Sequence, residues 1–341
     1  MAPGRRGLNT HGGTGKRLGD KKPLATRGLF SKHFQDARTV WAACAVLLLV
    51  LWVAVAIFFV QRVHARERER SAEVVSTAKG FSEYVGLHLL FVDRVLQNAR
   101  ELYARTGAIP RHALLARDLG SVSALLLQVA VADAQGNVVA SSLPLNPGVS
   151  IADRPHFLAF RNDPGDRLHV SEPVVGRVSG KMSLQLVRPV LGPAGEFRGV
   201  IVASIDPQKL QHYFASLDAL AAGGRVLIAG RDDGIVRAQF EQEQISWGLS
   251  VRASAHWDTL ASDLRGSYKA KASSIDGSNR LVGFHKVADY PLVVIVSTLV
   301  PLLSPYELGL GIAFGLAMTL VLVSFARGRV RRGRDQALLV V

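Results

Sequence analysis

Few of the chemically reactive residues in this 341-residue chain stand at spacings that a catalytic or metal site requires. The glycine-rich segment 11–17 lacks the pattern of a phosphate-binding loop, because Thr10 stands where its first glycine is required and Arg17 replaces the magnesium-binding Ser or Thr. Asp232 and Asp233 are too isolated for a calcium loop and are better explained as a turn. The histidines show no metal-ligand spacing, and no Ser/His/Asp, Cys/His or paired-carboxylate arrangement stands out. We therefore expect no catalytic site, no metal site and no cofactor in this chain.

Two long apolar runs decide how the chain is organised. Residues 40–60 and about 306–325 each have the length, about 20 residues, that an α-helix needs to cross a hydrocarbon core. Much of the net charge of +14 lies in the tails, since residues 1–39 carry nine Lys or Arg against two Asp, and residues 326–341 carry five Arg against one Asp. This positive-inside pattern predicts both termini in the cytoplasm and the central region outside it. We expect the tails to contact anionic membrane lipid and not nucleic acid.

The first apolar run admits a second interpretation as a cleaved signal peptide. We favour a retained anchor, because the run is longer than a typical signal-peptide core and no clear small-x-small cleavage site follows it. The single cysteine, Cys44, lies inside this run. The outer region therefore has no disulfide and must be stabilised by its core.

The region between the two runs predicts a long helix followed by two small units of similar plan. Apolar residues recur every three or four positions from residue 61 to about 106, so one helical face could pack on a domain or on the same helix of a second chain. Each unit has a hairpin, a helix and three further strands. The expected strands are 126–131, 138–141, 168–174, 181–191 and 196–205, then 225–229, 235–240, 266–273, 280–287 and 292–299, with helices at 154–160 and 253–264.

Several motifs follow one another along the region after the long helix. They are 131–141 (VADAQGNVVAS), 151–157 (IADRPHF), 177–181 (RVSGK), 195–206 (GEFRGVIVASID), 275–277 and 290–294. In their order and spacing, these motifs resemble the double Cache sensor domains of bacterial transmembrane receptors, and the resemblance covers most of residues 61–300. It implies an α+β fold in which a long N-terminal helix is followed by two stacked PAS-like antiparallel-sheet modules, flanked by two transmembrane helices.

We accordingly expect seven parts along the chain. They are a basic disordered cytoplasmic tail (1–39), a transmembrane helix (40–60), a long periplasmic stalk and dimer helix (61–106), a membrane-distal Cache module (107–215), a membrane-proximal Cache module (216–303), a second transmembrane helix (306–325) and a short basic cytoplasmic tail (326–341).

The resemblance also implies a ligand pocket in the membrane-distal module, between its sheet and the segment around residues 151–161. Family members that bind amino acids tend to have an Arg before a Trp-Tyr pair, with aspartates on later strands. Arg154 matches the Arg, but Gly176 and Ser204 stand where the aspartates would lie. An α-ammonium group needs a buried anionic partner, whereas a guanidinium binds a carboxylate, so a small anion such as an organic acid is our hypothesis. The candidate ligand-binding residues are Arg154, His156, Phe157, Arg161, Arg177 and Lys181.

Structural roles remain open for several of these residues. Arg154 could form an ion pair with its neighbour Asp153, and Asp153 is better explained as a helix N-cap than as a ligand contact. His156 could be a hydrogen-bonded, half-buried histidine. Arg177 and Lys181 could be solvated in a turn.

The leading hypothesis is the sensory half of a two-pass receptor in a bacterial inner membrane, with a periplasmic sensor and homodimerisation through helix 61–106. It would bind a small molecule and signal to an output domain absent from this chain, a diguanylate cyclase or a histidine kinase. The apolar, uncapped end at Val341 fits a truncation or frameshift. The alternative is a complete protein without an output domain that modulates a partner receptor. A membrane enzyme is disfavoured by the missing catalytic constellation.

Overall fold

The described residues of this computed structural model fall into two compact units. One unit holds the two apolar segments, and the other is formed by Val63–Leu302. Residues 1–24 of the expected disordered tail, and the expected module boundary at residue 215, lie outside the described residues. The structure describes residues 25–109, 125–209, 223–241, 244–271, 273, 275–300 and 305–339.

Two long helices contain the apolar segments. Helix α1 (Ala25–Thr106) runs without interruption through the first apolar segment and the helix predicted after it. No proline occurs between Pro23 and Pro110, so nothing in the sequence stops a helix from propagating once it has nucleated. The expectation of disorder is therefore wrong for residues 25–39, which belong to α1. Helix α6 (Pro305–Leu339) contains the second apolar segment, and both helices include a stretch long and apolar enough to cross a membrane.

The apolar parts of α1 and α6 pack closely against each other. The Cys44 thiol lies 3.8 Å from the carbonyl oxygen of Leu322, and Trp52 Nε1 donates to Thr319 Oγ1 at 3.3 Å. A Cβ atom added at Gly315 would lie 2.8 Å from the Trp52 ring. Glycine at this position therefore permits the close approach of the two helices.

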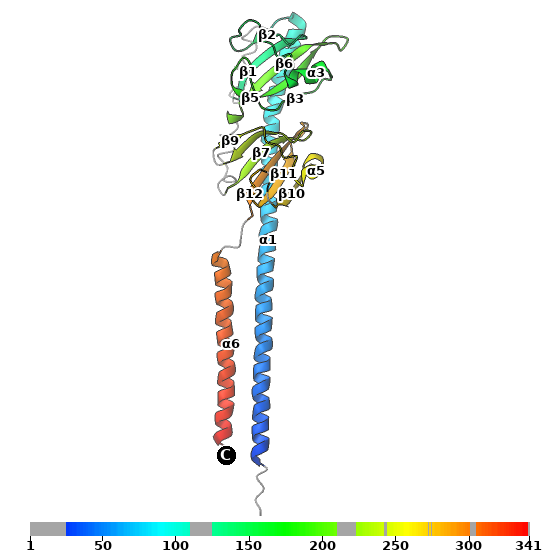
Figure 1. Ribbon diagram of the computed structural model, residues 1–341. Helices are drawn as coiled ribbons and strands as arrows, with labels where there is room; N and C mark the ends of the chain where they lie inside the picture. Colours follow the sequence, from blue (N-terminus) through cyan, green and yellow to red (C-terminus); the bar gives the residue numbers. More distant parts are fainter. Residues whose placement is uncertain are drawn as a thin grey trace, which may run out of the picture. The chain divides into compact units, whose positions relative to one another are not determined.

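The first module (residues 125–206) is an antiparallel sheet with one short helix (Figure 1). Its elements are β1 (Leu126–Asp133), β2 (Val138–Ser141), α3 (Pro155–Arg161), β3 (His169–Val170), β4 (Val174–Val175), β5 (Met182–Leu191) and β6 (Phe197–Ile205). The strand order is β2-β1-β6-β5-β3, and β4 also pairs with β5. The strand predicted at 168–174 is instead two short strands, because Pro173 lacks the N–H that a ladder needs.

The second module (residues 223–300) repeats this plan, as the sequence predicts. Its sheet has the order β10-β11-β12-β7-β8-β9, and every pairing in it is antiparallel. Strand β9 is not predicted by the sequence, and α5 is shorter than the helix expected at 253–264. The elements are β7 (Arg225–Gly230), β8 (Val236–Glu241), β9 (Gln244–Ser246), α5 (Trp257–Ser262), β10 (Arg265–Ala270), β11 (Arg280–Lys286) and β12 (Leu292–Leu299).

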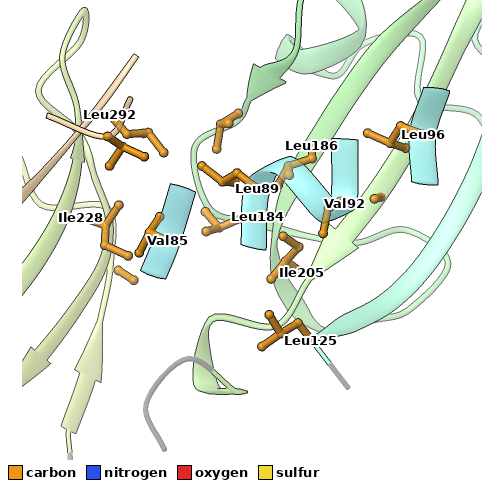
Figure 2. Close-up of a cluster of buried hydrophobic side chains, with 14 of the residues drawn as sticks. Val85, Leu89, Val92, Leu96, Leu125, Leu184, Leu186, Ile205, Ile228 and Leu292 are labelled. Atoms are coloured by element: carbon orange, nitrogen blue, oxygen red, sulfur yellow. The ribbon is translucent and has the colours of Figure 1, made fainter. Parts of the chain in front are cut away.

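One face of α1 supplies a core that the two modules share. In Figure 2, Val85 lies beside Ile228 and Leu292 of the second module, and Leu89 lies beside Leu184 of the first. This burial follows from the three- and four-residue spacing of the apolar side chains along the helix. The buried stripe, whose members are at most 7% exposed, consists of Ala78, Phe81, Val85, Leu89, Val92, Leu96 and Ala99.

Candidate functional site

A cavity of about 40 Å³ lies in the first module, between strands β1, β6 and β5 and the segment that leads into α3. This volume accommodates only a few water molecules. Its lining is mostly apolar and includes several valines. The polar lining residues are Gln128, Arg154, His156, Arg177, Gln185 and Ser204.

Arg154 is positioned by the start of α3. It is the N-cap residue with an extended backbone (φ −77°, ψ 136°), and Pro155 stands in the first turn, where its missing N–H is not needed. The Arg154 side chain lines the cavity, and its Nη2 donates to the Val175 carbonyl oxygen at 3.0 Å. The prediction that Asp153 caps this helix is wrong, because its carboxylate is bound by Arg177 and no side chain caps α3.

Arg177 and Asp153 form a two-bond ion pair, with both N–O distances at 2.6 Å. Asp153 thus pairs with Arg177, and not with Arg154 as one of the open alternatives had it. The hydrogen bonds from Arg177 lower the pKa of the Asp153 carboxyl, and those bonds raise the pKa of Arg177 in turn. Arg177 lines the cavity, but its guanidinium is already engaged by this carboxylate, so Arg154 is the better candidate to bind an anion.

His156 lies in the first turn of α3 and lines the cavity. It is 4% exposed, and its Nδ1 has no hydrogen-bond partner among the described residues. Burial, reinforced by the nearby His169, Arg154 and Arg177, lowers the pKa of His156 to about 4. The ring is therefore neutral at pH 7, and its buried Nδ1 has an unused hydrogen-bonding capacity among the described residues.

The other three predicted binding residues lie outside the cavity lining. Phe157 is fully buried in the core, where its ring packs edge-on against Phe197 with centroids 5.7 Å apart. Arg161, at the end of α3, and Lys181, just before β5, are exposed. The structure thus brings three of the six candidates together at the cavity.

The sequence analysis did not predict a row of polar side chains on the sheet. Gln128 on β1, Ser204 on β6 and Gln185 on β5 pair in register and are at most 5% exposed. Ser204 Oγ donates to Gln185 Oε1 at 2.7 Å, Gln185 Nε2 donates to Ser183 Oγ at 2.9 Å, and Gln128 Nε2 donates to Ser141 Oγ at 3.1 Å. The available signal was an uncharged polar residue among the apolar residues of each of these strands.

The cavity has no acidic side chain among the described residues that line it. Gly176 and Ser204, which the resemblance aligns with aspartates, both line it. The charge at the site therefore comes from Arg154 and Arg177, and its remaining polar groups are neutral.

A second cavity of about 40 Å³ lies in the second module and is lined by Arg225 and Arg280. Both guanidiniums are already bound by the carboxylates of Glu241 and Asp276, in a closed cluster of balanced charge. Within the described ranges, no group of three or more His, Cys, Asp or Glu could hold a metal ion.

Comparison with known proteins gives one family and several structures. The family model of the Cache domain (dCache_1) matches residues 61–301. The extracellular domain of rpHK1S-Z16, described as a histidine kinase, is 24% identical with a TM-score of 0.60, over 67% of this chain and 93% of that one. A second similar structure is the ligand-binding domain of the amino acid chemoreceptor PctB of Pseudomonas aeruginosa PAO1, in complex with L-Gln. It is 16% identical with a TM-score of 0.51, and the match covers 66% of this chain and 89% of that one. No curated protein matches the sequence. These structures share the fold of this chain.

Proposed function

Because this chain belongs to the Cache domain family, we propose that it is the sensory half of a bacterial receptor that detects a small molecule outside the cytoplasm. The observation that carries the proposal is the cavity of the first module, where the buried Nδ1 of His156 has no hydrogen-bond partner among the described residues. A buried polar atom is unfavourable unless a ligand or water supplies the missing bond. The first module is thus the proposed ligand-binding, membrane-distal module.

The proposed ligand is a small organic acid. Arg154 supplies a planar guanidinium at the cavity, a group that binds a carboxylate through two parallel hydrogen bonds. An α-amino acid would place an ammonium group where the described lining has no carboxylate, and an unpaired buried charge is unfavourable. PctB is a chemoreceptor for amino acids, and we propose that this chain differs from it in ligand class.

Ligand entry requires the small cavity to widen, which gives binding a conformational consequence. Strand β5 contributes Gln185 to the cavity and Arg188 three residues later, and residues at odd spacing on a strand point to opposite faces. Arg188 Nη2 binds Asp93 Oδ2 of α1 at 2.8 Å. A ligand that binds the widened cavity more tightly than the small one would therefore act on α1 through β5. The free energy by which it shifts the balance between these two states equals the difference between its binding free energies for them.

We further propose that the protein crosses the inner membrane twice, with the sensor in the periplasm and both termini in the cytoplasm. The basic tails support this orientation and contact with anionic lipid.

Homodimerisation through α1 is supported by three apolar side chains of that helix, Leu87, Leu90 and Phe91, which are 45–56% exposed. The signal would reach a diguanylate cyclase or histidine kinase module outside this chain. In the alternative, the protein modulates a partner receptor through its helices.

Thermal unfolding of the full chain in lipid nanodiscs tests the proposed site, with acetate, propionate, succinate and L-glutamine as probes. An acid present at 100 times its Kd stabilises the folded state by about 2.7 kcal/mol, which raises the melting temperature measurably. Arg154→Ala should abolish the rise. Arg161→Ala is the matched control, because it removes an arginine of the same helix that lies outside the cavity lining. A rise that survives Arg154→Ala, or one given by L-glutamine alone, would contradict the proposal.

A further inference from the structure

The row formed by Gln128, Ser204 and Gln185 points to a narrower ligand class than organic acids in general. These side chains stand at one level of three adjacent strands, β1, β6 and β5, and all line the same cavity. Each is at most 5% exposed. Buried polar groups need hydrogen bonds, and a cavity lined by several of them suits a polar occupant.

The row can form more hydrogen bonds than those described above. A primary amide has two N–H donors and an acceptor oxygen, and a hydroxyl has one donor and two lone pairs. The described bonds use one N–H of Gln128, one N–H of Gln185 and the Ser204 hydroxyl proton. A group that both accepts and donates could therefore bind here. The neutral His156 lines the same cavity, and its buried Nδ1 has no partner among the described residues.

These groups are uncharged, so they suit a neutral polar group of the ligand, while Arg154 suits its carboxylate. Arg154 and the row line the same cavity, so one molecule bound there can contact both. We propose that the ligand is a short carboxylic acid with a hydroxyl or oxo group on the carbon next to the carboxylate. Arg154 binds the carboxylate, and the row and His156 bind the neutral group. This inference rests on the proposed function, because it concerns the same site.

Isothermal titration calorimetry of the full chain in nanodiscs, at pH 7, tests this with four three-carbon acids. L-lactate, pyruvate, L-alanine and propionate share a carboxylate and differ at the neighbouring carbon, which bears a hydroxyl, oxo or ammonium group or hydrogen alone. One hydrogen bond between ligand and site corresponds to roughly a tenfold change in affinity. We expect lactate or pyruvate to bind at least about tenfold more tightly than propionate, and alanine to bind more weakly than propionate.

Two variants test whether the polar row is the source of the preference for lactate or pyruvate over propionate. Gln128→Leu and Ser204→Ala should each bring the affinity for lactate or pyruvate towards that for propionate, while propionate binding changes little. The matched control is Gln239→Leu, because Gln239 is also buried, at 7% exposed, but lies on β8 of the second module. It should leave all four affinities unchanged.

The outcomes separate this inference from the proposed function. Equal binding of propionate and both substituted acids would overturn the inference and leave the proposed organic-acid site standing. Tightest binding of alanine would overturn both the inference and the proposed ligand class. Failure of all four acids to bind would overturn the inference and remove the support for a small-acid sensor, whatever the variants do.

Discussion

His156 is almost fully buried, although a histidine side chain can carry a charge near neutral pH. Its folded-state pKa is about 4, against 6.5 for an exposed histidine, because burial opposes its charged form. Between pH 6.5 and 4 the unfolded chain therefore binds a proton that the folded chain does not, and stability falls as the pH is lowered through this window. We expect a loss of about 3 kcal/mol from this group, measured by urea unfolding at pH 7 and pH 4.

The variant His156→Gln identifies the source of that loss, because glutamine does not titrate. The pH dependence should flatten between pH 6.5 and 4. The part that remains is assigned to His169, whose pKa burial also lowers, and to Glu67 and Glu196, whose carboxyl pKa values are lowered from 4.5. The lowered carboxyl pKa values of Asp233 and Asp276 act below this window, since their ordinary value is 3.8. An unchanged pH profile in His156→Gln would show that this ring is not held neutral by its surroundings.

Asp153 controls how much of the positive charge at the cavity is available to a ligand. Its carboxylate engages both terminal nitrogens of Arg177, and both side chains are exposed, so the pair contributes little to stability. Asp153→Asn should leave the melting temperature nearly unchanged and strengthen the binding of a small acid by a few-fold, because Arg177 gains freedom to face the cavity. Calorimetry with the acid that binds the unaltered chain provides the check, and weaker binding by Asp153→Asn would count against an anion-selective site.

At the scale of elements, α1 and its buried stripe stabilise both modules. Leu96 is fully buried in this stripe, so Leu96→Ala should lower the free energy of unfolding by about 2–5 kcal/mol through lost burial and the cavity left behind. Leu264→Ala is the matched control, because Leu264 is 60% exposed and its truncation should cost little. Equal effects of the two substitutions on the urea midpoint would contradict the role assigned to the stripe.

The contact between α1 and β5 depends on a buried ion pair. Asp93 and Arg188 have side chains 8% and 13% exposed, and Asp166 also binds Arg188, at 2.7 Å. Arg188→Leu leaves the Asp93 carboxylate buried without its partner, so it should destabilise the fold by about 3–5 kcal/mol. The double variant Asp93→Leu/Arg188→Leu should recover much of that loss, because it removes both charges. If urea unfolding finds the double variant as unstable as Arg188→Leu, the loss does not come from the unpaired Asp93 carboxylate, and the prediction is wrong.

The sequence predicted those features that depend on local patterns. The stripe of α1 follows from its spacing, and the first hairpin follows from Asp133, whose carboxylate accepts bonds from the N–H groups of Gln135 and Asn137. The site could be predicted only in part, because its polar row exists through the pairing of β1 with β6 and of β6 with β5. The partner of Asp153 is likewise 24 residues away, so the sequence around Asp153 does not reveal it.

At the scale of the whole molecule, the proposed homodimer depends on one surface of α1. The exposed apolar residues Leu87, Leu90 and Phe91 of α1 are the proposed contact between two copies. Leu87→Asp with Phe91→Asp should shift the protein towards the monomer without unfolding it, because a charge in an apolar interface loses its water. Light scattering coupled to size-exclusion chromatography reports the mass, and circular dichroism reports the fold. A dimer unaffected by both substitutions would place the contact elsewhere.

The central claim is that a small acid binds in the first module beside His156. The most direct measurement is nuclear magnetic resonance of the full chain in nanodiscs with ¹⁵N-labelled histidine, with the His156 signal assigned by its loss in His156→Gln. The account predicts that the acid found to bind by calorimetry shifts the Nδ1 resonance of His156, because that nitrogen gains a hydrogen bond. Calorimetric binding of the acid with an unchanged His156 resonance would contradict the account, because the ligand would then bind at another site.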